Sequence, residues 1–294
     1  MQNIWLSIFL ITLSLQSIAE PLFWQVEKGK TRYLIFGSVH VGDESMYPLP
    51  KAITETLSSS SGLIVESDVR AMQDVTYPEI TLVTKEVLDN KQQKTLRGLA
   101  SLFNIDAQQL LNSPPWASAL TLQMKQFEYL GYQASQGIDT HLMYKAAAEN
   151  IPIFGLESLQ FQIDLLTGQK DSGKELLISA LDEFERSEDL TKCLIESWKA
   201  GDLAKLNQFS TLTEMSPELE NAFITQRNRD WAKQLAKPTW SRKSKANYLV
   251  VVGTLHLIGE NSLLEMLKDK GFTVSQKSKS DSANCKFEHS PLSN

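Results

Sequence analysis

Cysteine and histidine are scarce in this 294-residue sequence, which has two Cys and four His. Two cysteines do not make a disulfide scaffold, and neither Cys193 nor Cys285 lies in a C-x-x-C metal spacing; whether they pair with each other stays open. The sequence also has no Gly-rich phosphate loop, no G-x-S-x-G nucleophile elbow and no H-E-x-x-H motif. Serine-hydrolase and zincin mechanisms therefore have no direct support.

Positive charge is not in excess either. The chain has 29 Lys and Arg residues against 35 Asp and Glu, for a net charge of −6. A nucleic-acid-binding surface would be basic, so we expect no nucleic-acid partner. The hydrophobic content of 42% and the charged content of 22% are ordinary for a globular protein.

Apolar runs long enough to cross a membrane are also missing. The N-terminal run, Ile4–Leu15, is shorter than the roughly 20 residues that a transmembrane helix needs. Ser17-Ile18-Ala19 resembles a signal-peptidase site. The sequence thus predicts a signal peptide over residues 1–19, cleaved after Ala19, and a periplasmic or secreted protein with no stable membrane span after cleavage. Because the first residues lack Lys and Arg, an uncleaved anchor is the alternative.

Short apolar runs in the remaining chain alternate with helical patterns. We predict strands over Phe23–Val26, Arg32–Phe36, Leu63–Val65, Ile153–Leu156, Tyr248–Val252 and Phe272–Val274. The stretches from about 80–150 and 158–240 are mostly helical in pattern, and the second includes helices predicted over Leu159–Leu166, Lys174–Lys199 and Pro217–Leu235. Ser241–Ala246 is predicted to be a solvated basic loop. The prediction is therefore one α/β domain over residues 20–276, with a mixed β-sheet core formed by the N- and C-terminal segments and a large helical insertion. The Ser/Lys-rich residues 277–294 are predicted to be a disordered tail.

Two G-x-x-H motifs lie more than two hundred residues apart. They are Gly37-Ser38-Val39-His40 and Gly253-Thr254-Leu255-His256, and each follows an apolar strand pattern. Chance predicts about 0.2 such matches in a chain with 14 Gly and four His. The carboxyl ends of strands line the crevice in which open α/β sheets bind ligands. The pair therefore predicts one site assembled from both ends of the chain, against the alternative that each histidine serves only strand-end packing.

Two glutamates follow predicted strands in the same way. Glu66 comes directly after Leu63–Val65, and Glu157 comes directly after Ile153–Leu156. A buried carboxylate must be paired, hydrogen-bonded or bound to a metal, because burying it alone is very costly. Two imidazoles and a carboxylate can hold a divalent metal with an open position. We expect His40, His256 and Glu66 to be metal ligands and Glu157 to be a second carboxylate or an outer partner, with helix caps or surface salt bridges as the alternative for both glutamates.

Two arginines are further candidates for the site, with less support from the sequence. Arg227 and Arg229 lie on a predicted helix with an apolar face, and either could clamp a carboxylate or stabilise an oxyanion. On an isolated helix both arginines would be solvated.

The residues that follow the two motifs are expected to be structural. Asp43 and Glu260, three and four residues after the histidines, are expected to cap helices rather than to orient the imidazoles. His141 falls in the first turn of a predicted helix and is expected to be structural, with Asp139 as the helix cap.

Taken together, these motifs resemble the TraB/PrgY/GumN family, whose broader group includes the Tiki-type metalloproteases. The resemblance extends over roughly Phe23 to Val274. The matching segments, in chain order, are Gly37–Asp43, Tyr47–Pro50, Val65–Asp68, Gly137–Asp139, Gly155–Ser158, Trp198–Asp202, Arg227–Ala232 and Val252–Gly259. The family arrangement is also similar to that of erythromycin-esterase-like and haem-binding ChaN-like proteins.

The resemblance implies a metal-dependent hydrolase of protease type. Its centre would be His40, Glu66 and His256, with Arg227 as a further polar site residue. The leading hypothesis is therefore an exported hydrolase that uses Mn, Co or Zn and a peptide or protein substrate, with Glu66, Glu157 and Arg227 in catalytic roles. One alternative is an exported haem-, metal- or peptide-binding protein without turnover. Another is a partner-binding protein that uses its helical insertion as the binding surface.

Overall fold

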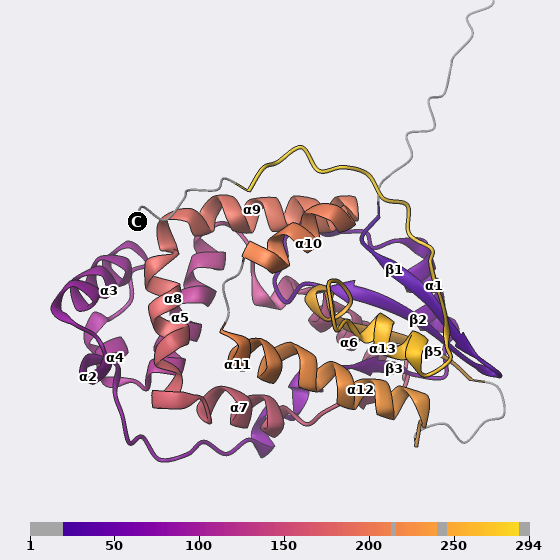
Figure 1. The fold of residues 1–294 in the computed structure, drawn as a ribbon, viewed down its shortest axis with the longest axis horizontal. Helices are drawn as coiled ribbons and strands as arrows, with labels where there is room; N and C mark the ends of the chain where they lie inside the picture. The colour runs from indigo at the N-terminus through magenta and orange to yellow at the C-terminus, as the bar shows by residue number, and fades with distance from the viewer. Residues whose placement is uncertain (1–19, 213–215, 240–245, 288–294) are drawn as a thin grey trace, which may run out of the picture.

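The centre of the molecule is a six-stranded mixed sheet (Figure 1), seen in a computed structural model that describes residues 20–212, 216–239 and 246–287. The strand order across the sheet is β4-β3-β5-β2-β1-β6. The strands are β1 (Phe23–Lys28), β2 (Thr31–Ser38), β3 (Leu63–Val65), β4 (Ile153–Gly155), β5 (Ala246–Gly253) and β6 (Thr273–Gln276). Both ends of the chain therefore contribute to one sheet, and the predicted α/β fold with a helical insertion is confirmed.

Four neighbouring strands run parallel and end at the same edge of the sheet. β2 pairs in parallel with β5, from Thr31 opposite Ala246 to Ser38 opposite Gly253. β5 pairs in parallel with β3, and β3 with β4. The opening hairpin places β1 antiparallel to β2 and to β6. Parallel strands are buried on both faces, which explains why β2 and β5 carry continuous apolar runs instead of an alternating pattern.

Helices surround this sheet and extend beyond it. In chain order they are α1 (Lys51–Ser59), α2 (Thr84–Val87), α3 (Asn90–Leu102), α4 (Ala107–Asn112), α5 (Pro115–Tyr129), α6 (Ile138–Ala148), α7 (Leu159–Thr167), α8 (Lys174–Asp182), α9 (Phe184–Ala200), α10 (Leu203–Leu212), α11 (Pro217–Glu220), α12 (Gln226–Ala236) and α13 (Leu263–Asp269). A π-helical turn, η5 (Asn221–Thr225), joins α11 to α12, and short 3-10 turns η1 (Glu44–Met46) and η6 (Thr254–His256) follow β2 and β5.

The hydrophobic interior has two parts. The larger cluster packs the sheet against its flanking helices and includes the fully buried Trp198 and Trp231. A second cluster lies in the helical insertion, where α3, α4, α5 and α8 pack around Leu96, Leu111 and Leu177. Figure 1 shows these helices on one side of the molecule and the sheet on the other. The site described below lies at the edge of the sheet, where the larger cluster ends.

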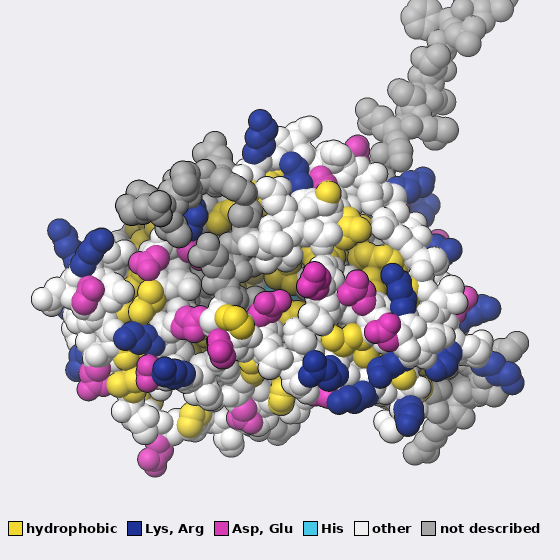
Figure 2. Space-filling model, viewed as in Figure 1, with side chains coloured by type: hydrophobic (Ala, Val, Ile, Leu, Met, Phe, Trp, Pro, Cys, Tyr) yellow, Lys and Arg dark blue, Asp and Glu magenta, His cyan; other side chains and the backbone are white. Residues whose placement is uncertain are grey.

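Acidic side chains are prominent on the face shown in Figure 2. Asp and Glu gather along the middle of that face, over α11 and α13, whereas Lys and Arg lie mainly toward its margins. This distribution agrees with the net charge of −6.

Two helical segments differ from the sequence prediction. The pattern predicts one helix over Lys174–Lys199, but the backbone breaks it into α8 and α9 at Glu183. The sequence also missed α10. Gly201, with φ of 62°, ends α9 in the left-handed conformation that glycine adopts most easily. Asp202 then accepts a hydrogen bond from the backbone N–H of Lys205 and starts the next helix.

The C-terminal segment also differs from its prediction. Residues 277–287, expected to be disordered, lie against the body of the protein. Cys285 forms a disulfide with Cys193 of α9, and Phe287 is buried. The low hydrophobicity of this segment predicts disorder. The disulfide and the buried Phe287 ring nevertheless hold it against the protein. Residues 288–294 lie outside the described part of the chain.

The predicted signal peptide, residues 1–19, lies outside the described residues, as does most of the predicted basic loop from Ser241 to Ala246. Within the residues that the structure describes, no helix is both long enough and apolar enough to cross a membrane.

Candidate functional site

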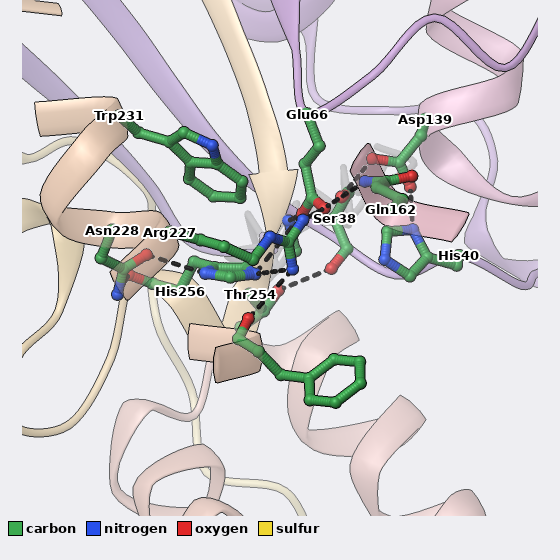
Figure 3. A network of polar contacts seen from close by, with 12 residues as sticks. Ser38, His40, Glu66, Asp139, Gln162, Arg227, Asn228, Trp231, Thr254 and His256 are labelled. Atoms are coloured by element: carbon green, nitrogen blue, oxygen red, sulfur yellow. Dashed lines mark hydrogen bonds and ion pairs between the residues drawn. The ribbon is translucent and has the colours of Figure 1, made fainter. Parts of the chain in front are cut away.

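The two G-x-x-H histidines and Glu66 come together at the carboxyl edge of the parallel strands (Figure 3). Gly253, the last residue of β5, marks their meeting point. A Cβ atom built on Gly253 would lie 3.2 Å from Glu66 Oε1, 3.6 Å from His256 Cδ2 and 3.7 Å from His40 Nε2. The structure thus brings together the three residues that the sequence proposed as metal ligands.

Glu66 is buried, with 7% of its side chain exposed. Its Oε1 accepts a hydrogen bond of 2.7 Å from the backbone N–H of Gly253, and its Oε2 accepts one of 2.6 Å from Arg227 Nη2. Burial raises the pKa of this carboxyl group, but the charges of His256, His40 and Arg227 and the Gly253 N–H outweigh burial and lower the pKa to about 2. Glu66 is therefore ionised at neutral pH.

His256 is also buried, and its tautomer is set by Asn228. His256 Nδ1 lies 2.7 Å from Asn228 Oδ1, while Asn228 Nδ2 donates to the backbone carbonyls of His256 and Asn261. The amide oxygen only accepts, so Nδ1 carries the hydrogen and Nε2 keeps a lone pair. Burial lowers the pKa of His256 to about 3, and the ring is neutral at pH 7. Trp231 packs against it, with 4.4 Å between ring centroids.

His40 differs from His256 in exposure and in its partner. Its side chain is 66% exposed, and Nδ1 lies 2.9 Å from Asp139 Oδ2. The other oxygen of Asp139 accepts a 2.6 Å hydrogen bond from the hydroxyl of the buried Ser38. The negative charge of Asp139 raises the pKa of His40 to about 9. Nε2 is the ring nitrogen that remains for the site beside Gly253.

The contact with His40 corrects the role expected for Asp139. The sequence suggested a helix cap, but the N-cap position of α6 belongs to Gly137, and no side chain caps that end. Asp139 lies in the first turn of α6 and faces the end of β2 instead. Asp139 thus positions the His40 imidazole. From the sequence alone, an acidic residue in the first turn of a helix could not be told apart from a helix cap.

Arg227 is the cation at the centre of the site, and only 8% of its side chain is exposed. Nη2 donates to Glu66 Oε2 and to Glu157 Oε1, both at 2.6 Å, and Nε donates to the Glu157 carboxylate at 3.2 Å. Nη1 donates to the carbonyl of Phe223 at 3.0 Å and to His256 Nε2 at 3.2 Å. A guanidinium has five N–H bonds. All five therefore have a partner.

Glu157 holds this arginine in place. Both of its oxygens accept from Arg227, and they also accept from Gln162 Nε2 at 2.9 Å and from Trp231 Nε1 at 3.1 Å. Gln162 Oε1 in turn accepts from the hydroxyl of Ser67, the residue after Glu66. The carboxylate is fully engaged in hydrogen bonds, so its position at the end of β4 supports Arg227.

Three polar residues of the site were missed by the sequence prediction as functional residues: Asp139, Gln162 and Asn228. Two of them lie in segments that carry the family resemblance, Gly137–Asp139 and Arg227–Ala232, so membership in those segments was a usable signal. Gln162 has no such signal, because it reaches Glu66 and Glu157 only through the packing of α7 beside the strand ends.

Arg229 and His141 lie outside the site. Arg229 is exposed on α12 and donates to Gln226 of the same helix. His141 is exposed on α6 and packs against Tyr47, with 4.6 Å between ring centroids and 42° between the ring planes. His289 lies outside the described residues.

The acidic residues after the two histidines behave differently from each other. Asp43 caps η1 by accepting from the backbone N–H of Ser45, as the sequence predicted. Glu260 was also expected to cap a helix, but the cap of α13 is Ser262, whose hydroxyl accepts from the backbone N–H of Glu265. Glu260 is exposed.

The donor set at Gly253 is of the kind that binds a divalent metal. Both imidazoles are anchored through Nδ1 to a side-chain oxygen, which leaves Nε2 for coordination, and Glu66 adds a carboxylate. Within the described residues, no group of three His, Cys, Asp or Glu side chains is arranged to hold a metal ion. Arg227 Nη1 donates to the lone pair of His256 Nε2. By their chemistry, two imidazole nitrogens and a carboxylate match the ligands of a divalent metal.

The chain is similar to several known proteins over most of its length. The chain is 29% identical over 242 residues to the uncharacterized protein YbaP of Escherichia coli (strain K12), covering 82% of this chain and 89% of that protein. It is 23% identical over 211 residues to an uncharacterized protein of Treponema pallidum (strain Nichols), covering 67% and 63%.

A shorter match links the chain to a protein with a named activity. The Metalloprotease TIKI homolog of Amphimedon queenslandica is 32% identical over 82 residues, which are 28% of this chain and 14% of that protein. No solved structure matches the chain. The model of the TraB/PrgY/gumN family matches residues 22–276, which include every site residue described above. The chain therefore belongs to the TraB/PrgY/gumN family.

Proposed function

We propose that this protein is an exported metal-dependent hydrolase that acts on peptides or proteins. The observation that carries the proposal is the convergence of His40, Glu66 and His256 around the position that a Cβ on Gly253 would take, with both imidazoles oriented through Nδ1. The partial similarity to a protein named a metalloprotease supports the choice of reaction. Family membership alone would not, because one fold hosts many functions.

His40, Glu66 and His256 would hold the metal, which we propose to be Mn²⁺, Co²⁺ or Zn²⁺. Bound there, such an ion would supply Lewis-acid chemistry that activates water and polarises the scissile carbonyl. Asp139 and Asn228 orient the two imidazoles, so the ligand nitrogens need little reorganisation.

Arg227 and Glu157 have different roles in the proposed reaction. Arg227 stabilises the negative charge that develops on the substrate oxygen, for which it must have a free N–H. Glu157 positions Arg227 rather than transferring a proton, because both of its oxygens accept hydrogen bonds from Arg227 and from its other neighbours.

Export is part of the proposal. The sequence of residues 1–19 predicts it, and the disulfide between Cys193 and Cys285 supports it, because stable disulfides form mainly in oxidising compartments. Peptides or proteins of that compartment would then be the substrates.

Metal content is the direct test. We expect the chain from residue 20 onward, purified without chelators, to carry about one equivalent of a transition metal by elemental analysis. His40→Ala and His256→Ala should each lose it. His141→Ala is the matched control, because His141 is an exposed histidine outside the site and should leave the metal content unchanged.

A hydrolysis assay completes this test. The loaded protein should cleave members of a peptide library, and the two site variants should not. A wild-type protein that takes up no Mn²⁺, Co²⁺ or Zn²⁺ on titration would remove the metal-dependent mechanism.

A further inference from the structure

The charge balance of the site in this conformation depends on Arg227. Glu66 and Glu157 are both buried, with 7% and 8% of their side chains exposed, and Arg227 Nη2 contacts both at 2.6 Å. Two carboxylates buried without a cation would be strongly unfavourable. The guanidinium therefore supplies the positive charge that a metal ion would otherwise bring.

One of the five hydrogen bonds of Arg227 conflicts with metal binding. Nη1 donates to His256 Nε2, whose lone pair is the one a metal ligand must offer. The opposite ring nitrogen of His256 is committed to Asn228, so the imidazole has no second lone pair. Arg227 and a metal ion cannot both use His256 Nε2.

The other contacts of Arg227 leave room for an exchange. Nε and Nη2 remain bonded to Glu157, and Nη1 has a second partner in the carbonyl of Phe223. The guanidinium also lies over the ring of Trp231, 4.7 Å from its centroid. Losing the bond to His256 therefore does not free the side chain from its place.

We propose that Arg227 is a stand-in cation that holds the metal-free site together, and that metal loading exchanges its Nη1–His256 hydrogen bond for coordination by His256. This inference rests on the proposed metal-dependent function. The exchange also leaves one N–H of Arg227 free beside the bound ion, which is the donor that the substrate oxygen requires. Arg227 thereby links metal loading to readiness for substrate.

The exchange predicts opposite effects of one substitution. Arg227→Met removes the charge and all five donors while keeping a long apolar stem. The metal-free variant should unfold at a lower urea concentration than the wild type, because Glu66 and Glu157 lose their counter-ion. Its affinity for Co²⁺ should rise, because no guanidinium competes for His256 and the negative potential of the site increases. We expect the Kd for Co²⁺ to fall at least about tenfold.

The experiment uses Co²⁺ alone as the probe. Its visible absorption bands report coordination directly, and urea unfolding is measured with and without the ion. Arg229→Met is the matched control, since Arg229 is an exposed arginine on the same helix, and it should change neither quantity. Arg227→Lys is the second variant, in case Arg227→Met does not fold. It keeps the charge but has only three N–H donors, and its Kd should lie between the other two.

Co²⁺ binding by Arg227→Met and by the wild type distinguishes the exchange from the proposed function. Tighter Co²⁺ binding by Arg227→Met than by the wild type supports the exchange. Equal or weaker binding overturns it, while the metal-dependent function stands. If only the variant binds Co²⁺, Arg227 excludes the ion from the wild type, and the proposed function fails while the stand-in role holds. If neither binds, both proposals are wrong.

Discussion

At the scale of single residues, the site depends on a glycine, Gly253, which has no side chain. Gly253 has φ of −52° and ψ of 136°, a backbone conformation open to any residue, so its role is not backbone freedom. Its role is space. A Cβ there would come within 3.2 Å of Glu66 Oε1 and 3.7 Å of His40 Nε2. The glycine of the second G-x-x-H motif thus keeps open the volume between the proposed ligands.

Replacing Gly253 by Ala should therefore damage the site far more than the fold. The added methyl group would lie 3.2 Å from Glu66 Oε1, so the carboxylate must shift by a few tenths of an ångström, while the backbone is unstrained. We expect metal content and peptide hydrolysis to fall at least about tenfold, with a loss of unfolding free energy of about 1 to 3 kcal/mol, as for overpacking. Elemental analysis, hydrolysis rates and urea unfolding measure the three effects.

The control is Gly98→Ala. Gly98 is exposed within α3, and a Cβ on it would have no neighbour within 4 Å. Alanine there should stabilise the protein by about 0.5 to 1 kcal/mol and leave metal content unchanged. A Gly253→Ala protein with normal metal content would show that the three ligands do not meet at this residue.

At the scale of elements, two helices orient the two histidines by different chemistry. Asp139 on α6 gives His40 a carboxylate partner, whereas Asn228 on α12 gives His256 an amide. The carboxylate raises the pKa of His40 to about 9. Burial lowers the pKa of His256 to about 3. In the metal-free protein at neutral pH, one imidazole is therefore charged and the other neutral.

Asp139→Asn should reduce the difference in pKa between His40 and His256. We expect the pKa of His40 in the metal-free protein to fall from about 9 toward its ordinary 6.5, because the negative charge of Asp139 is the largest cause of the shift. NMR titration of the imidazole protons measures it, and the pKa of His141 should not move.

The same variant has a consequence for stability. A raised folded-state pKa contributes stability that is fully present below pH 6.5 and is lost as the pH rises through about 9. Urea unfolding between pH 6 and 9 should show this dependence in the wild type and a reduced one in Asp139→Asn. An unchanged His40 pKa would mean that Asp139 is not its electrostatic partner.

At the scale of the whole molecule, long-range connections build the site. The parallel pairing of β2 with β5 joins residues more than two hundred positions apart, and it places His40 beside His256. A disulfide adds a covalent connection across 92 residues, between α9 and the segment after β6. The helical cluster around Leu96 and Leu111 packs separately from the sheet. The site rests on the sheet and its flanking helices.

Loss of the disulfide should destabilise the protein without disturbing the site. Closing a loop of 92 residues lowers the entropy of the unfolded chain, which corresponds to about 4 to 5 kcal/mol in the chain-entropy model. We expect the double variant Cys193→Ala, Cys285→Ala to lose about that much free energy of unfolding, measured as a lower urea midpoint. It should retain its metal. Addition of a reductant to the wild type should have the same effect. Equal unfolding midpoints in the oxidised and reduced wild type would contradict this prediction.

Local sequence patterns predicted the strands and the polar residues that follow them, but not helix α10 or the break between α8 and α9. Apolar runs located β2, β3 and β5, because burial on both faces of a parallel sheet demands continuous hydrophobicity. The same local signals placed His40, Glu66, Glu157 and His256 just beyond strand ends. Helix starts and stops were visible wherever a proline or a glycine marked them.

Which of these side chains touch depends on the tertiary structure. Strand order and register bring residues together across 100 to 200 positions, and no local pattern encodes that distance. The partnership of Asp139 with His40, the five hydrogen bonds of Arg227 and the link from Cys193 to Cys285 are of this kind. A periodic pattern reports which face of an element is buried, whereas the identity of a side chain's neighbours depends on how whole elements pack.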